Sequence, residues 1–180
     1  MLHMLAERGA ETLDADAVYH ALIAPGAPLW EALRSRFGSE ILAPDGTIDR
    51  RALGAMVFAD PAALAELDAL THPAVVAEVL RLIEESRADV MVVDAVKLVE
   101  SGLAEACDAL WLVTCDPDRQ VERLMHRNGF SREEAERRVA LQPSLDGQRA
   151  RASEVIDNRG SIEETRRQVA EAWERLPILH

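Results

Sequence analysis

Short apolar runs, each followed by polar or acidic residues, recur along the chain and constrain its fold more than any other feature. Such a run is typical of a buried strand in a parallel sheet. Ligands of these sheets bind at the carboxyl ends of the strands, so the residues after each run are candidates for a site. The runs are Glu11–Leu13 before Asp14 and Asp16, Val90–Val93 before Asp94, Ala109–Val113 before Thr114–Asp116, and Val155–Ile156 before Asp157 and Asn158.

Helix start signals lie between these runs. An acidic cap followed by a first-turn proline, or a serine followed three residues later by a glutamate, predicts where a helix begins. Strand and helix therefore alternate, which predicts an α/β fold with an open, mostly parallel sheet. Residues 15–86 contain no convincing strand and are expected to form a helical insertion. The signals are Asp60–Pro61 for a helix to Leu70, His72–Pro73 for another to about Ser86, Asp116–Pro117, Ser131 with Glu134, and Ser161 with Glu164.

The composition limits the class of protein. With 180 residues, 48% of them hydrophobic, the chain is most simply one globular domain. No run approaches the roughly 18 apolar residues that cross a bilayer, and the first residues lack the pattern of a secretory signal. We therefore expect a cytoplasmic protein without a membrane partner. The two cysteines and five histidines form no cluster, so no metal ligand is assigned.

Charge is unevenly distributed along the chain. The formal net charge of −12 argues against a nucleic-acid partner, because such a protein must neutralise a row of phosphates. Between Arg119 and Arg151, however, eight arginines face five acidic residues. This stretch suits a local polyanion site, and a solvated helix face of alternating charges is an equally good interpretation.

Eight short segments occur in the order and spacing of dephospho-CoA kinases, and the resemblance spans essentially the whole chain. It implies transfer of the ATP γ-phosphoryl group to the ribose 3′-hydroxyl of dephospho-CoA, with Mg²⁺, on a fold similar to that of P-loop nucleoside monophosphate kinases. It also implies an acceptor-binding insertion at about residues 15–88 and a lid at about 117–150. The segments are Leu13–Asp16, Ala24–Leu33, Asp45–Leu53, Val57–Pro61, Thr71–Pro73, Val99–Leu103, Glu122–Arg127 and Val155–Ser161.

The acceptor side of this resemblance carries three residues. Asp16 matches the family carboxylate that accepts the proton of the acceptor hydroxyl, a role that suits a carboxylate. Asp14 beside it is a candidate for substrate binding, and capping of the following helix explains either residue equally simply. His72 matches the family's His-Pro step in the acceptor-binding insertion, where a cap or a packing role is the alternative.

The nucleotide side is expected to use arginines and a glycine-containing loop. Arg123, as a catalytic residue, and Arg127 and Arg137, as ATP-binding residues, lie in the region that resembles the lid, where guanidinium groups pair well with phosphate oxygens. Asn158 and Gly160 resemble the family's adenine-side loop, where glycine allows a close approach of the backbone. Exposed solubilising arginines and a plain turn are the competing interpretations.

The sequence departs from the family in two places. It contains no G-x-x-x-x-G-K-[ST], the loop whose amides and lysine hold the phosphates. We expect that the recorded start is wrong and that roughly 15 to 20 upstream residues, a strand and this loop, are missing. Lys97 stands where the family more often has a proline and leucines, and a surface variant is favoured over a cation near the acceptor.

Three functions are compatible with these features. A kinase of dephospho-CoA is the leading hypothesis, and a kinase of another nucleotide is its nearest rival. A non-catalytic remnant that binds nucleotide or CoA-like ligands is the third, and it predicts little or no kinase activity for the 180 residues. A monomer or weak oligomer is expected.

Overall fold

The computed structural model describes residues 1–140, 142 and 145–176, and the chain divides into two compact units. The first unit contains Met1–Leu103 and the second contains Ala104–His180. Each unit has one pair of parallel strands, so the predicted parallel α/β class is confirmed. Among the described residues the four strands form these two pairs, β1 with β2 and β3 with β4.

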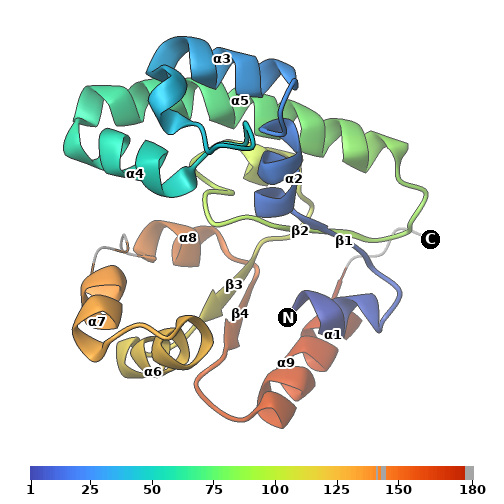
Figure 1. The fold of residues 1–180 in the computed structure, drawn as a ribbon. Helices are drawn as coiled ribbons and strands as arrows, with labels where there is room; N and C mark the ends of the chain where they lie inside the picture. The colour runs from blue at the N-terminus through green and yellow to red at the C-terminus, as the bar shows by residue number, and fades with distance from the viewer. Residues whose placement is uncertain (141, 143–144, 177–180) are drawn as a thin grey trace. The chain divides into compact units, whose positions relative to one another are not determined.

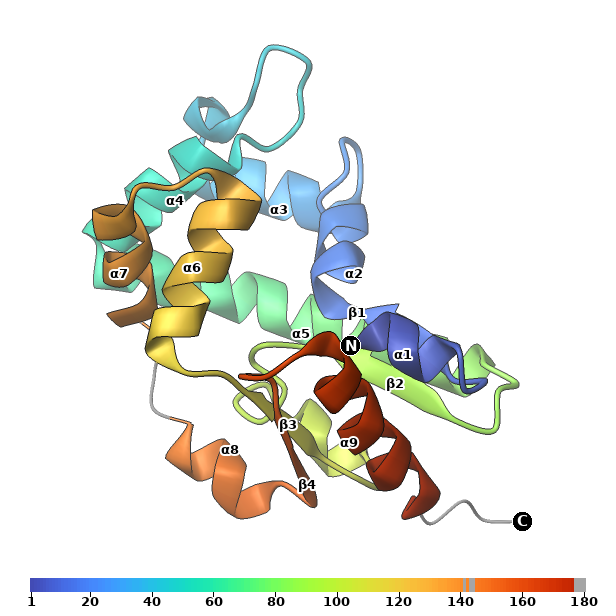
Figure 2. The same cartoon turned by 90° about the horizontal axis from the view of Figure 1, so that it is seen from below.

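In the first unit, the strands β1 and β2 lie in parallel with their carboxyl ends level. The register pairs Glu11 with Met91 and continues to Asp14 with Asp94, so two aspartates face each other at the end of the pair. Helix α1 contacts both strands, and α2 begins at the residue after β1 (Figure 2). The bounds are Leu2–Ala6 for α1, Glu11–Asp14 for β1, Ala15–Leu22 for α2 and Met91–Asp94 for β2.

The segment between these strands is helical, as the sequence predicts. Residues 15–86, all of them described, hold no strand and only an isolated bridge between Leu42 and Ile48. The long helix α5 contacts α2, α3 and α4 (Figure 1). Their core includes Trp30, Leu33 and Val57. The bounds are Pro28–Phe37 for α3, Ser39–Ile41 for the 3-10 turn η1, Arg50–Ala59 for α4 and Pro61–Glu85 for α5.

The prediction that His72 and Pro73 open a new helix is wrong, because α5 continues through Pro73. An internal proline removes one backbone hydrogen bond and normally breaks a helix. Here α5 is buried on both sides of it, at Thr71 and at Val79, so packing fixes the helical backbone. The hydroxyl of Thr71 also donates to the carbonyl of Leu67 at 2.8 Å, which adds a bond close to the proline.

In the second unit, helix α9 packs on β4, which pairs in parallel with β3 (Figure 2). The predicted capping box of Ser161 and Glu164 is present at the start of α9. As predicted, Asp116 is the N-cap residue of α6 and Pro117 is its first residue. The expected lid region contains α6, α7 and α8, and its residues 141, 143 and 144 lie outside the described residues. The bounds are Leu103–Ala106 for the 3-10 turn η2, Trp111–Thr114 for β3, Pro117–Asn128 for α6, Arg132–Ala140 for α7, Asp146–Arg151 for α8, Glu154–Asp157 for β4 and Ile162–Glu174 for α9.

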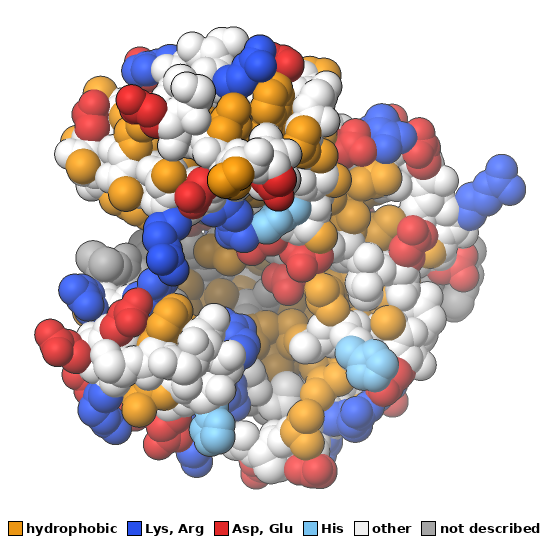
Figure 3. All heavy atoms as spheres, viewed as in Figure 1, with side chains coloured by type: hydrophobic (Ala, Val, Ile, Leu, Met, Phe, Trp, Pro, Cys, Tyr) orange, Lys and Arg blue, Asp and Glu red, His pale blue; other side chains and the backbone are white. Residues whose placement is uncertain are grey.

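The surface carries charges of both signs. Figure 3 shows basic and acidic side chains interspersed with hydrophobic ones over α3 and α4. None of the described helices has the length and apolar character needed to cross a membrane.

Candidate functional site

Three aspartates gather at the carboxyl end of the β1–β2 pair. Asp14 is the N-cap of α2, and its Oδ1 accepts from the backbone amide of Asp16 at 2.9 Å. Burial raises the pKa of Asp94, and the nearby carboxylates of Asp14 and Asp16 add to the rise. The strand end is therefore acidic and partly desolvated, and a cation bound there would stabilise the ionised carboxylates.

A cavity of about 320 Å³ opens in the first unit next to this strand end. Asp16, on the first turn of α2, lines it together with residues of α5 and of the segment after β2. The polar members of the lining are Asp16, Tyr19, Asp68, Thr71, His72, Lys97 and Ser101. The cavity thus combines a carboxylate at a helix start with a cation and a histidine.

The cation is Lys97, which contacts two residues of α5. Its Nζ lies 3.0 Å from Oδ2 of Asp68 and 3.3 Å from Nε2 of His72. The same Nε2 lies 3.2 Å from Oδ1 of Asp68, so the three groups contact one another. The sequence favours a surface role for Lys97, and the structure places it in the lining of this cavity.

The structure thus brings two of the three predicted acceptor residues together. Asp16 and His72 line one cavity, although 56 positions separate them in the chain. Asp14 lies outside this lining and caps α2, the alternative use that the sequence allowed. A substrate-binding role for Asp14 stays a prediction.

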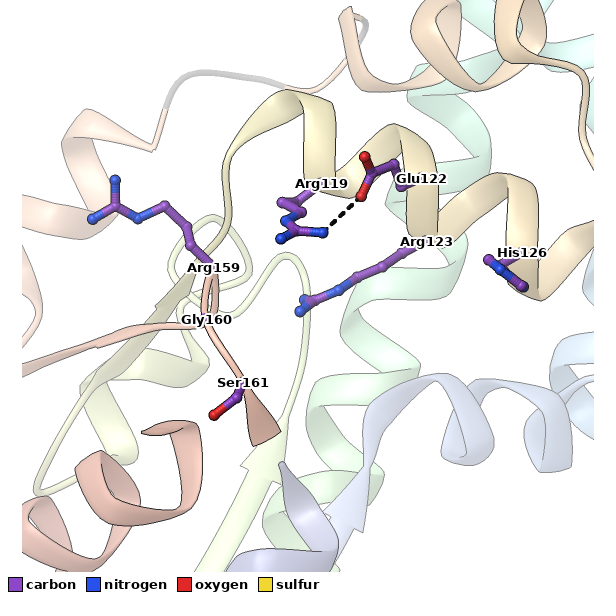
Figure 4. A pocket seen from close by; sticks show the side chains of 7 residues that line it. All are labelled: Arg119, Glu122, Arg123, His126, Arg159, Gly160 and Ser161. Atoms are coloured by element: carbon purple, nitrogen blue, oxygen red, sulfur yellow. Dashed lines mark hydrogen bonds and ion pairs between the residues drawn. The ribbon is translucent and has the colours of Figure 1, made fainter. Parts of the chain in front are cut away.

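The second unit has a larger and more basic cavity of about 580 Å³ (Figure 4). One wall comes from α6, and the other comes from the loop between β4 and α9. Because α6 buries Val121, its other face is left to charged residues. The lining consists of Arg119, Glu122, Arg123, His126, Arg159, Gly160 and Ser161.

Arg123 connects the two walls of this cavity. Its Nη2 donates to the backbone carbonyl of Asn158 at 2.9 Å, and its Nη1 lies 3.6 Å from Sγ of Cys115. Figure 4 shows the side chain extending from α6 toward the loop that carries Gly160. These contacts hold the guanidinium at the cavity and leave it exposed to a ligand.

Asn158 and Gly160 shape the loop between β4 and α9. The side-chain oxygen of Asn158 accepts from the hydroxyl of Thr165 at 3.0 Å, and the backbone amide of Asn158 donates to the backbone carbonyl of Thr114 at 2.8 Å. A Cβ at position 160 would overlap the carboxylate of Glu164, which completes the capping box of α9. Any larger residue here would therefore have to displace the Glu164 side chain.

Two arginines of this cavity were not among the predicted site residues. Arg119 pairs with Glu122 on α6 at 2.9 Å. Arg159 donates to both carboxylate oxygens of Asp157, and this hydrogen bonding lowers the pKa of Asp157. The excess of arginines between Arg119 and Arg151 was the signal for Arg119, and Arg159 lies within the Val155–Ser161 segment of the resemblance.

The other predicted arginines lie outside this lining. Nε of Arg127 donates to the side chain of Asn128 at 3.1 Å, and Arg137 lies in the last turn of α7. Neither is among the described residues of the cavity wall, so their ATP-binding roles stay predictions. The described residues also contain no group of three or more His, Cys, Asp or Glu side chains that could hold a metal ion.

Comparison with known proteins gives a consistent result. Residues 1–164 match the family model described as CoaE, dephospho-CoA kinase. The chain is 47% identical to the dephospho-CoA kinase of Symbiobacterium thermophilum, covering 94% of this chain and 72% of that protein. It is 44% identical to the dephospho-CoA kinase of Geobacter metallireducens, covering 94% and 86%. The crystal structure of TT1252 from Thermus thermophilus superposes with a TM-score of 0.81 at 30% identity, covering 97% of this chain and 89% of that one.

Proposed function

The chain belongs to the dephospho-CoA kinase family, and on that premise we propose how its residues serve phosphorylation of the ribose 3′-hydroxyl of dephospho-CoA by ATP. The cavity of the first unit binds the acceptor, and the cavity of the second unit binds the phosphates of ATP. The observation that carries this assignment is Asp16 on the wall of a cavity of about 320 Å³, within the range of small-molecule sites.

Asp16 acts on the acceptor hydroxyl. A carboxylate within hydrogen-bond reach of an alcohol orients it and accepts its proton as the phosphoryl group arrives. Asp16 lines the cavity, and its backbone amide is already bonded to Asp14, which fixes the first turn of α2. The acceptor hydroxyl is therefore placed against Asp16, and His72 on α5 contacts the same ligand.

Arg123 acts on the transferred phosphoryl group. Phosphoryl transfer depends on positioning and on cations that spread the developing charge. Arg123 is held by the carbonyl of Asn158, and Arg119 and Arg159 line the same cavity. Asn158 and Gly160 form the adenine-side edge of the site, and Arg127 and Arg137 contribute to ATP binding.

Mg²⁺ is the metal that this family implies, and the residues present fit it. Protein sites for Mg²⁺ commonly offer one or two carboxylates and leave the other positions to phosphate oxygens and water. Asp94 and Asp14 face each other at the strand end, and burial has raised the pKa of Asp94, which a cation would reverse. We assign these two carboxylates to the metal, which when bound neutralises phosphate charge.

The remaining assignments follow from the same proposal. The acceptor-binding part is residues 15–88, within a single domain of 180 residues, and the lid is residues 117–150. We propose a cytoplasmic enzyme that is a monomer or weak oligomer and has no nucleic-acid partner.

One observation favours a second candidate, a protein that binds these ligands without catalysing the reaction. No part of the 180-residue sequence supplies the G-x-x-x-x-G-K-[ST] loop that holds the β and γ phosphates. The two candidates share their binding sites and differ in turnover.

Binding by calorimetry tests the proposal without requiring turnover. Dephospho-CoA is expected to bind more tightly than AMP, and Asp16→Ala to weaken dephospho-CoA binding while ATP binding is unchanged. Glu84→Ala is a matched control, because Glu84 lies on α5 outside the lining of the acceptor cavity. A preference for AMP or another simple nucleoside monophosphate would instead identify a kinase of a different nucleotide.

A further inference from the structure

Lys97 is the only lysine of the chain, and the structure places it in the cavity that we assign to the acceptor. It lies in the segment after β2, where the side chain reaches α5. The described lining of this cavity contains no arginine. Lys97 is therefore the one permanently charged cation that a ligand in this cavity meets among the described residues.

The contacts of Lys97 are of a kind that a ligand can replace. Its Nζ lies 3.2 and 3.0 Å from the two carboxylate oxygens of Asp68, and the side chain of Lys97 is 53% exposed. Ion pairs this exposed contribute little to stability, because water screens them and both side chains lose freedom. An incoming anion can take the place of Asp68 at small cost.

The charges around the cavity require such a cation. Asp16 and Asp68 both line it, so a ligand with phosphate groups meets two like charges. An ammonium group on a flexible stem can turn from Asp68 to a phosphate oxygen, because lysine binds as a point charge without a fixed fork geometry. His72, 3.3 Å from Nζ, is placed to add a second donor to the same anion.

We propose that Lys97 binds the phosphate or pyrophosphate group of the acceptor, and that Asp68 holds Lys97 in the cavity until this anion replaces it. The proposal rests on the proposed function, because it identifies the part of the acceptor that the same cavity recognises. Lys97 and Asp68 then determine specificity. An acceptor that carries an anion gains a contact with Lys97, and a neutral nucleoside does not.

The experiment compares a charged and a neutral ligand on matched variants. Calorimetry measures dephospho-CoA and adenosine binding to the wild type, to Lys97→Met and to Arg81→Met. Arg81 is the control, because it lies on α5, pairs with Glu78 and Glu85, and is outside the lining. Lys97→Met is expected to weaken dephospho-CoA binding roughly 10- to 100-fold, the usual loss of one hydrogen bond to a charged group. Adenosine binding stays unchanged, and Arg81→Met leaves both affinities within about 2-fold.

Three further measurements keep the test independent of any one variant. Lys97→Arg retains the charge and is expected to recover most of the affinity. The affinity of the wild type for dephospho-CoA is expected to fall with salt, with a shallower slope in Lys97→Met, since fewer ionic contacts are screened. Asp68→Asn removes the competing carboxylate and is expected to leave dephospho-CoA affinity equal or higher.

The outcomes separate this inference from the proposed function. If the wild type binds dephospho-CoA and Lys97→Met binds it equally well, the lysine assignment is wrong and the acceptor cavity stands. A loss of affinity in Asp68→Asn as large as in Lys97→Met overturns the exchange of Asp68 for the anion. If the wild type fails to bind dephospho-CoA at all, both the acceptor cavity and the role of Lys97 are rejected.

Discussion

Replacing Gly160 by alanine tests the packing that shapes the cavity of the second unit. The capping box of α9 has two bonds: the amide of Ser161 donates to Oε2 of Glu164 at 2.7 Å, and the amide of Glu164 donates to Oγ of Ser161 at 3.2 Å. A Cβ at position 160 overlaps the Glu164 carboxylate and comes within 3.0 Å of its Cδ. Glu164 must therefore move, and the first of the two bonds is lost.

The expected magnitude follows from two opposing effects. A hydrogen bond to a charged group contributes about 1.5 kcal/mol or somewhat more, and exposure of Glu164 keeps the loss near the lower end. The backbone of Gly160 is outside the positive-φ glycines, so alanine also gains about 0.4–1 kcal/mol from a less flexible unfolded chain. Gly160→Ala should therefore destabilise the protein by about 1 kcal/mol.

A double-mutant cycle with Glu164→Ala separates these effects. In that background the carboxylate is gone, and the nearest remaining contact of the new methyl group is the Cβ of residue 164 at 3.6 Å. Gly160→Ala should then stabilise, which gives a coupling energy of about 1.5 kcal/mol. Urea unfolding followed by circular dichroism measures each variant. An equal cost of Gly160→Ala in both backgrounds would refute the argument, because the methyl group would then clash with something other than Glu164.

Three other outcomes are expected. Asp94→Asn should increase the free energy of unfolding at pH 7 by about 0.2–1 kcal/mol, as for like charges facing across strands, and so raise the melting temperature; the gain should vanish near pH 3. The sign follows because burial and the neighbouring carboxylates raise the folded pKa of Asp94, so its ionised form costs stability at pH 7 and its protonated form does not. Arg123→Met should weaken ATP binding about 10-fold in calorimetry. Arg127→Met should weaken it less, since Arg123 lines the cavity and Arg127 does not; equal losses would contradict this. The 180-residue polypeptide should show little or no transfer from ATP to dephospho-CoA with Mg²⁺, and turnover near the 1–100 s⁻¹ of ordinary kinases, measured by CoA formation, would count against the role given to the missing motif.

The sequence predicts the backbone of the site well, because that part depends on local signals. Apolar runs followed by polar or acidic residues locate the four strands of the described residues, and serine with glutamate at the proper spacing locates the start of α9. These patterns act over a few residues, so they can be recognised without tertiary information. Pro73 is the exception: its local signal favours a helix start, and burial of Thr71 and Val79 keeps one continuous helix.

The side chains of the site are harder to predict, because their roles depend on contacts between distant residues. Lys97 has no distinguishing neighbours in the sequence, and only the fold brings Asp68 and His72 to it. Arg159 lies in a short loop, and only the fold brings Oδ1 of Asp116 to 3.7 Å from its Nη1. Asp14 illustrates the opposite case: two roles fit the sequence equally, the structure shows the capping contact, and the substrate-binding role stays a prediction.

The two cavities differ in charge in the way that phosphoryl transfer to an alcohol requires. The cavity of the second unit carries three arginines and one glutamate, which suits a ligand whose phosphates bring several negative charges. The cavity of the first unit carries two aspartates and one lysine, which suits a hydroxyl that must lose a proton. An acidic cavity alone would repel an acceptor that also carries phosphate, so Lys97 resolves the conflict between the base that the reaction needs and the anion that the acceptor brings. A neutral residue at position 97 would keep the base and lose the attraction, and the variants of Lys97 and Asp68 measure these two contributions separately.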